Sequence, residues 1–100
     1  MKIPLNNYSE FIDAETLNRG AQYFYNGQLT QIKWTDSKTL SAHAAGQEIY
    51  EVQLIIEDEN IIDHSCTCPY SKKSFCKHKA GLVIYLQEER LQKILKNRSK

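Results

Sequence analysis

All three cysteines of this 100-residue chain fall within residues 65–81, in the segment SCTCPYSKKSFCKHKAG. The same segment holds one of the three histidines and four of the thirteen basic residues. Cysteines that crowd together in this way form a disulfide, a reactive thiol or a metal site, and each needs different neighbours. The choice among these chemistries is therefore the strongest constraint that the sequence places on fold and function.

The start of the chain, MKIPLNNYSEF, contains no apolar run of signal-peptide length, and the longest apolar stretch, AGLVIYL, is too short to span a bilayer. We therefore expect a cytoplasmic protein with no membrane partner. An odd number of cysteines in a reducing compartment argues against a disulfide framework. A metal site or a reactive thiol remains.

Written as spacing, the cluster is C-x-C-x7-C-x-H, formed by Cys66, Cys68, Cys76 and His78. Three thiolates and one imidazole are a ligand set of closed, tetrahedral, structural zinc sites. Residues two apart on a strand point to the same side, so Cys66 and Cys68 can face one ion. Residues two apart on a helix point about 200° from each other, so Cys76 should precede a helix whose first turn carries His78. One zinc ion would then join a strand to a helix.

Three other interpretations of the cluster stay open beside this one. The cysteines could be buried without a metal, although buried cysteines pack as small apolar residues and rarely gather beside lysines. Cys76 and His78 could be a nucleophile and its base, but the sequence shows no orienting group and no oxyanion-hole pattern. Zinc could bind His64 in place of His78, which would crowd three alternating ligands onto one strand. Because four protein ligands close the shell that catalytic zinc leaves open to water, we expect no enzymatic activity in this segment.

Composition and periodicity predict a single α+β domain. Hydrophobic residues make up 41% of the chain and charged residues 25%, as in ordinary globular domains. Residues 13–29, DAETLNRGAQYFYNGQL, have helical spacing, with Asp13 as the N-cap and Gly27 in the left-handed position at the end. Gly20 lowers the helix propensity of this segment, which favours a close-packed neighbour at that position.

From Leu29 onward the hydrophobic period changes to two. Four short alternating segments, separated by DSK, AGQ and DEN, predict an antiparallel β-meander whose apolar face packs on the first helix. Residues 78–98, HKAGLVIYLQEERLQKILKNR, are too many for a strand and predict a C-terminal helix. The zinc site would join the last strand to this helix. We expect one domain over residues 1–100, with a core of about 13–96.

The pattern C-x-C, a short gap, then C-x-H before an apolar helix resembles the SWIM zinc finger of bacterial Swi/Snf-type helicases, plant transposases and some eukaryotic signalling proteins. The segment LNRGAQYFYNGQL resembles the helix that precedes the meander in the bacterial members, so the resemblance covers about residues 13–86. It implies a zinc fold with DNA-binding or protein-interaction roles and a helicase motor elsewhere, since the chain has no G-x-x-x-x-G-K-[ST] phosphate loop. The chain would be the N-terminal fragment of a larger helicase-type protein, or a protein on its own.

Basic residues concentrate in the half of the chain that carries the cysteines. Residues 1–60 have four basic and nine acidic side chains, a net charge of −5, whereas residues 61–100 have nine and three, a net charge of +6. Lysines interleaved with aromatic rings can contact phosphates and stack on bases. The candidate contacts to DNA or RNA are Lys72, Lys73, Lys77, Lys79 and Tyr70. A solvated loop that only keeps the site soluble is the simpler alternative, and docking of a protein partner or of the parent enzyme's motor is the competing function.

Overall fold

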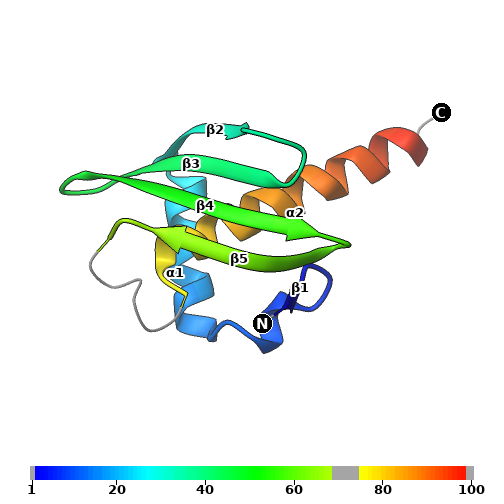
Figure 1. The fold of residues 1–100 in the computed structure, drawn as a ribbon, viewed down its shortest axis with the longest axis horizontal. Helices are drawn as coiled ribbons and strands as arrows, with labels where there is room; N and C mark the ends of the chain where they lie inside the picture. Colours follow the sequence, from blue (N-terminus) through cyan, green and yellow to red (C-terminus); the bar gives the residue numbers. More distant parts are fainter. Residues whose placement is uncertain (1, 69–74, 99–100) are drawn as a thin grey trace.

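The computed structural model describes residues 2–68 and 75–98, and the side chains of residues 2–68 and 75–92. Within these residues the fold is α+β, as predicted (Figure 1). In chain order the elements are β1 (Ile3–Pro4), the 3-10 helix η1 (Tyr8–Glu10), α1 (Ala14–Tyr25), β2 (Leu29–Trp34), β3 (Thr39–Ala45), β4 (Ile49–Glu57), β5 (Asn60–Cys66) and α2 (Lys77–Arg98).

The strands form one antiparallel sheet in the order β1-β5-β4-β3-β2. Strands β2 to β5 are the predicted meander, because each pairs with the next along the chain. The sheet has a fifth strand that was not predicted, since β1 pairs with β5 through Ile3 opposite Ile61. A strand of two residues has no periodicity by which a sequence could reveal it.

The connection between β4 and β5 is a tight hairpin that fixes the register of the cysteine-bearing strand. Asp58 and Glu59 have φ angles of 53° and 66°, and the residues that flank them, Glu57 and Asn60, form a strand pair. Positive φ at both central residues is the geometry that matches the twist of a two-residue hairpin. Together with a one-residue register shift between Ile55 and Ile56, this hairpin places Cys66 opposite Val52 of β4.

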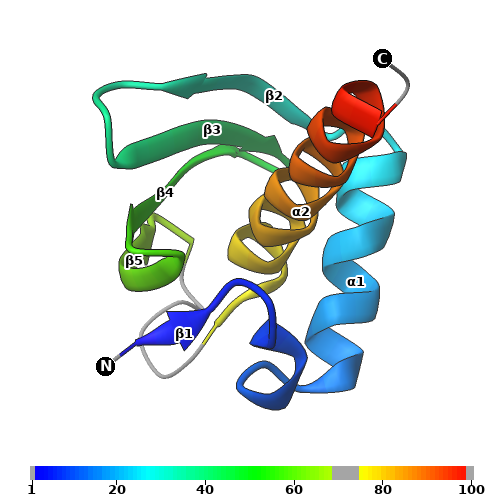
Figure 2. The same cartoon turned by 90° about the vertical axis from the view of Figure 1, so that its right-hand side faces the viewer.

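The two helices lie on one side of the sheet, and α2 is the one that contacts the sheet directly (Figure 2). Helix α2 touches β2, β4 and β5, whereas α1 packs chiefly on α2. The prediction that the apolar face of the sheet packs on the first helix is therefore wrong. The helix that follows the cysteines takes that place, and it brings its own N-terminus against the end of β5.

Helix α1 begins and ends where the sequence predicts. The backbone N–H of Thr16 donates to Oδ2 of Asp13 at 3.0 Å, which satisfies one of the free donors of the first turn. Hydrogen bonds from Thr16 hold the pKa of the Asp13 carboxyl below its usual value. At the other end Gly27 has φ 73°, the left-handed conformation that glycine adopts without strain.

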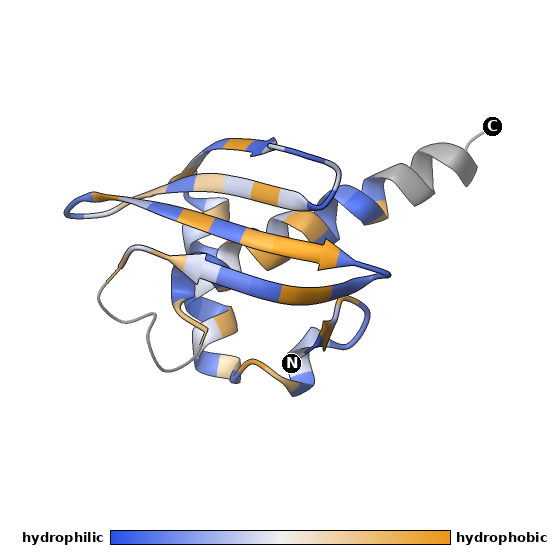
Figure 3. Ribbon diagram, viewed as in Figure 1, coloured by the Kyte–Doolittle hydropathy of each residue, from blue (hydrophilic) through white to orange (hydrophobic). Residues whose placement is uncertain are grey.

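The core lies between the inner face of the sheet and α2. Alternate residues of β3 and β4 are buried, and Figure 3 shows the matching alternation of hydrophobic and hydrophilic residues along these strands. The helix contributes three leucine and valine side chains to the same core. The central members of the core are Leu40, Ala42, Ala44, Val52, Leu54, Leu82, Val83 and Leu86. Among the described helices, none combines the length and apolar character needed to cross a membrane.

Candidate metal centre

Two of the four predicted ligands come from the end of β5. Cys66 is the last residue of the strand, and Thr67 remains tied to β4 beyond it. The N–H of Thr67 donates to the carbonyl oxygen of Glu51 at 3.1 Å, and the N–H of Glu51 donates to Oγ1 of Thr67 at 3.0 Å. These two bonds keep the chain extended for one more residue, so that Cys66 and Cys68 can project to the same side.

The other two ligands come from the start of α2. Cys76 immediately precedes the helix, and His78 is its second residue, as the spacing predicts. The N–H of Ala80 donates to the carbonyl oxygen of Cys76 at 3.0 Å, which closes the first turn. The backbone N–H of Lys79 donates to the sulfur of Cys76. A thiolate in this position is stabilised by the positive end of the helix dipole.

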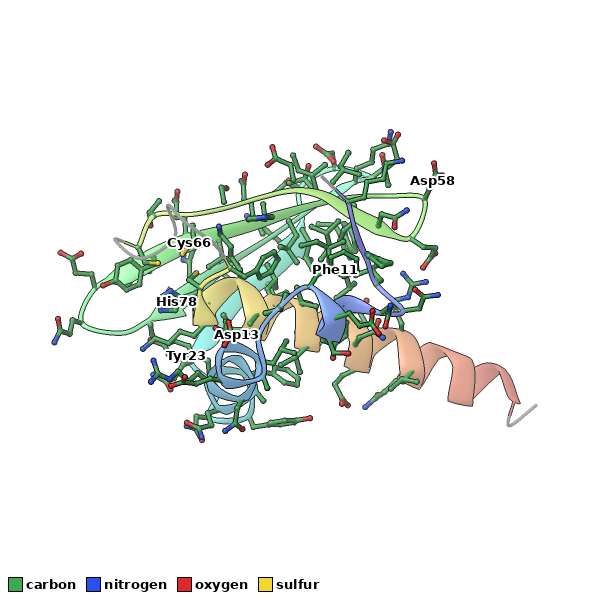
Figure 4. The ribbon with its side chains drawn as sticks, turned by 90° about the horizontal axis from the view of Figure 1, so that it is seen from below. Phe11, Asp13, Tyr23, Asp58, Cys66 and His78 are labelled. Atoms are coloured by element: carbon green, nitrogen blue, oxygen red, sulfur yellow. The ribbon has the colours of Figure 1, made fainter. Side chains whose placement is uncertain are left out.

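The four side chains converge on one point between β5 and α2, and Figure 4 shows Cys66 and His78 on neighbouring elements there. One ligand atom from each of Cys66, Cys68, Cys76 and His78 lies within 4.8 Å of all the others. Nδ1 of His78 is 3.6 Å from Sγ of Cys66 and 3.8 Å from Sγ of Cys76. Zinc bonds of about 2.3 Å to sulfur and about 2.05 Å to nitrogen place such atoms about 3.6 Å apart in a tetrahedron. The Cys3His group can therefore hold one metal ion.

The cysteines influence one another's protonation. A hydrogen bond with Cys66 lowers the pKa of the Cys76 thiol, and the same pairing raises the pKa of Cys66. A single thiolate at Cys76 is thus favoured, and it is stabilised by neighbouring donors. A divalent ion that binds all three sulfurs replaces their protons, since metal ligands bind deprotonated.

The ring of His78 is held between two tyrosines that the sequence pattern did not mark as part of the site. The ring of Tyr23 on α1 meets it edge-on, with centroids 4.9 Å apart and an interplanar angle of 83°. The ring of Tyr50 on β4 lies 4.9 Å away at 33°. Tyr50 belongs to the inward-facing row of its strand, which is a signal of burial and not of function. These contacts fix the orientation of the imidazole that directs Nδ1 at the sulfurs.

The two ring nitrogens of His78 have different surroundings, since only Nδ1 faces the sulfurs. Nε2 is buried and makes no hydrogen bond to any of the described residues. When Nδ1 binds a metal, Nε2 carries the proton and is a donor.

The remaining predicted residues lie in three different settings. Tyr70, Lys72 and Lys73 fall outside the described residues. Lys77 is exposed, and its Nζ lies 5.2 Å from the centre of the Tyr23 ring. Lys79 is buried, with 2% of its surface exposed, so it cannot contact DNA or RNA as was expected from the sequence. Its position in the first turn of α2 turns the side chain inward, toward His64.

His64, the alternative ligand, is not a member of the Cys3His group within the described residues. Its Nδ1 lies 2.9 Å from Nζ of Lys79, and its ring lies 4.4 Å from that of Phe75. Burial, and then the positive charge of Lys79, lower the pKa of His64. These contacts place the His64 side chain against the start of α2.

A cavity of about 550 Å³ adjoins the metal centre. Arg19 of α1 and Lys77 of α2 line it from two sides. Cys68 and Phe75, the described residues on either side of the undescribed stretch 69–74, also line it. The cavity therefore lies beside two of the cysteines and the start of α2.

Comparison with protein families agrees with this geometry. Residues 50–87 match the family model of the SWIM zinc finger. The matched segment runs from β4 to the middle of α2 and contains all four members of the Cys3His group. Searches of the curated proteins and of the solved structures each gave no match. A SWIM zinc finger is a non-catalytic, structural domain. The resemblance to the SWIM zinc finger inferred from the sequence is therefore confirmed over residues 50–87.

Proposed function

We propose that residues 1–100 form one folding unit in which Cys66, Cys68, Cys76 and His78 bind a single structural zinc ion. The observation that carries this proposal is the convergence of the four ligand atoms within 4.8 Å, from a strand end and a helix start. When bound, zinc supplies a link between β5 and α2 that is stable without a disulfide. Binding free energy at such sites is also folding free energy.

The residues around the centre give it two features of a structural site. Cys68, Cys76 and His78 are buried, and Cys66 is half-buried, so the described surroundings shield the ligands from water. Four protein ligands also leave no position for a reacting water molecule. The chain's own residues therefore position and enclose the ion.

We further propose that the domain is an accessory nucleic-acid-binding module, cytoplasmic, of a Swi/Snf-type helicase. Support comes from the charge of +6 in residues 61–100 and from the cavity lined by Cys68 and Phe75, the described residues on either side of the stretch that contains Lys72 and Lys73. Arg19 and Lys77 add positive charge there from two separate helices. Phosphates of DNA or RNA would then meet Lys72, Lys73 and Lys77, with Tyr70 available for stacking.

Fluorescence anisotropy with labelled single-stranded and double-stranded DNA and RNA oligonucleotides tests this role on the zinc-loaded protein. Binding should weaken steeply between 50 and 200 mM salt, the range in which phosphate contacts lose most affinity. The double variant Lys72→Ala/Lys73→Ala should bind more weakly and reduce the salt slope for duplex DNA by about 2. The matched control, Lys33→Ala/Lys38→Ala, removes two exposed lysines from the sheet side of the molecule and should bind as wild type.

The competing function is docking of a protein partner or of the parent enzyme's motor. Trp34 favours it, because this side chain is 44% exposed at the end of β2, the edge strand of the sheet. An exposed tryptophan at a strand edge is typical of interaction surfaces. Two results would overturn the nucleic-acid role: both double variants bind oligonucleotides as wild type does, or wild type binds no oligonucleotide at 50 mM salt. Docking would then be the function to pursue.

A further inference from the structure

Lys79 is the largest of the fully buried side chains in the described part of the chain, with 2% of its surface exposed. Lysine is almost never buried to this degree unless a partner compensates its charge. The first turn of α2 is the cause of the burial, since Ala80 beside it is completely buried and Lys77 two residues earlier is exposed. A compensating partner must therefore lie inside the fold.

The described contacts of the Lys79 ammonium do not include a carboxylate. Nζ donates to Nδ1 of His64 at 2.9 Å and lies 5.8 Å from the centre of the Phe75 ring. The three ion pairs found among the described residues involve other side chains: Arg19 with Glu15, Lys38 with Glu57 and Arg90 with Glu59. A neutral imidazole and an aromatic face attract an ammonium group, but neither carries a charge.

Inside the fold, negative charge on these elements would come from the metal centre, since Asp63 of β5 is exposed. Three thiolates and one divalent ion carry a net charge of −1, because the imidazole ligand is neutral. Lys79 directly follows the ligand His78, and its backbone N–H donates to the sulfur of Cys76. Its partner His64 lies two residues before Cys66 on β5. Lys79 therefore belongs to one ligand-bearing segment, α2, and its ammonium is hydrogen-bonded to the other, β5.

We propose that Lys79 is the internal counter-charge of the metal centre and that His64 positions it. The single positive charge of the ammonium balances the single negative charge of the zinc and its three thiolates inside the fold. His64 accepts one hydrogen bond from Nζ and so holds the charge between β5 and the start of α2. This role rests on the proposed zinc site. It accounts for the burial of Lys79, which a contact with nucleic acid would not.

The variant Lys79→Met keeps most of the volume of the side chain and removes its charge. Lys79→Arg keeps the charge, and Lys77→Met removes an exposed lysine from the same turn as a matched control. Apparent zinc affinity is measured for each full-length variant by competition with a chromophoric chelator, after wild type has been shown to bind one zinc. Residues next to the ligands typically change metal affinity 10- to 100-fold when they are mutated. We expect a loss of that size in Lys79→Met, a loss of less than about 5-fold in Lys79→Arg, and no change in Lys77→Met.

Cobalt substitution separates the charge from the packing of the side chain. Removal of a cation beside the sulfurs raises the energy of the thiolate electrons, so the sulfur-to-cobalt charge-transfer band of Lys79→Met should move to longer wavelength, and that of Lys79→Arg should not. If Lys79→Met does not fold in excess metal, Lys79→Gln is measured by the same two criteria. Equal affinity in wild type and the uncharged variant, equal losses in Met and Arg variants, or an unshifted band would each overturn the proposal. A wild-type protein that binds no zinc would instead refute the proposed function itself.

Discussion

Gly20 of α1 and Gly81 of α2 lie directly against each other where the two helices cross. A methyl group placed on Gly20 would come within 2.6 Å of the backbone nitrogen of Gly81, and one placed on Gly81 would come within 3.0 Å of the carbonyl oxygen of Gly20. Contacts below about 3 Å between such atoms are repulsive, and backbone cannot rotate away as a flexible side chain can. The absence of two side chains therefore sets the distance at which α1 packs on α2, and with it the position of Tyr23 beside His78.

Gly20→Ala should destabilise the domain, although alanine is the better helix former. The helix propensity gained is about 1 kcal/mol, whereas overpacking of a close contact costs typically 1–3 kcal/mol, and the contact here is with backbone. We expect a net loss of about 1–2 kcal/mol in urea unfolding of the zinc-loaded protein. Gly27→Asn is the control, since Gly27 has open space around it and asparagine tolerates its positive φ. A more stable Gly20→Ala variant would contradict the close approach of the helices.

The segment before α1 should contribute to stability, although no pattern in its sequence predicts this. Leu5, next to the unpredicted strand β1, is 1% exposed, and its N–H donates to the carbonyl oxygen of Glu59 at 2.9 Å. Truncation of a fully buried leucine costs about 2–5 kcal/mol. Leu5→Ala should therefore lower the free energy of unfolding by an amount in this range, measured by urea titration. Its exposed neighbour Asn6→Ala should change it by less than about 0.5 kcal/mol. Equal, small effects of both variants would show that this segment does not pack on the sheet.

The two histidines of the cysteine region should differ sharply when each is changed to serine. His78→Ser removes a member of the Cys3His group, so the purified protein should contain less than one zinc per chain. His64→Ser removes the partner of Lys79 and the ring contact with Phe75 but no member of the Cys3His group, so the protein should keep one zinc, with an affinity lowered by about 10- to 100-fold at most. Elemental analysis after dialysis against a weak chelator measures both. The reverse result would assign the fourth ligand to His64.

The sequence was sufficient for those parts of the structure that depend on neighbours along the chain. The spacing of Cys76 and His78 predicts the start of α2 because residues two apart on one helix cannot both face one ion. The cap at Asp13 and the turn at Gly27 likewise depend on residues close to them in the sequence. The meander follows from period-two alternation, which the burial of β3 and of the first part of β4 displays, although a register shift between Thr30 and Lys33 interrupts it in β2.

The errors concern contacts between distant parts of the chain. Which helix covers the sheet depends on the close crossing at Gly20 and Gly81, and a glycine in a helix predicts a neighbour without naming it. Lysine is usually exposed, so Lys79 could not be recognised as buried from its type alone. Tyr23 and Tyr50 meet at His78 only after α1 and β4 have packed around it. None of these pairings leaves a periodic signal in one sequence.

Zinc content and its link to folding test the central claim most directly. Elemental analysis of untagged protein should give one zinc per chain, and Cys→Ser changes at position 66, 68 or 76 should each abolish stoichiometric binding. Removal of the metal with a strong chelator should reduce the far-ultraviolet circular dichroism of the protein, and added zinc should restore it, because binding free energy at such sites contributes to folding. A protein that is purified without zinc, takes up none when it is offered, and keeps its full helical signal in chelator would contradict the account.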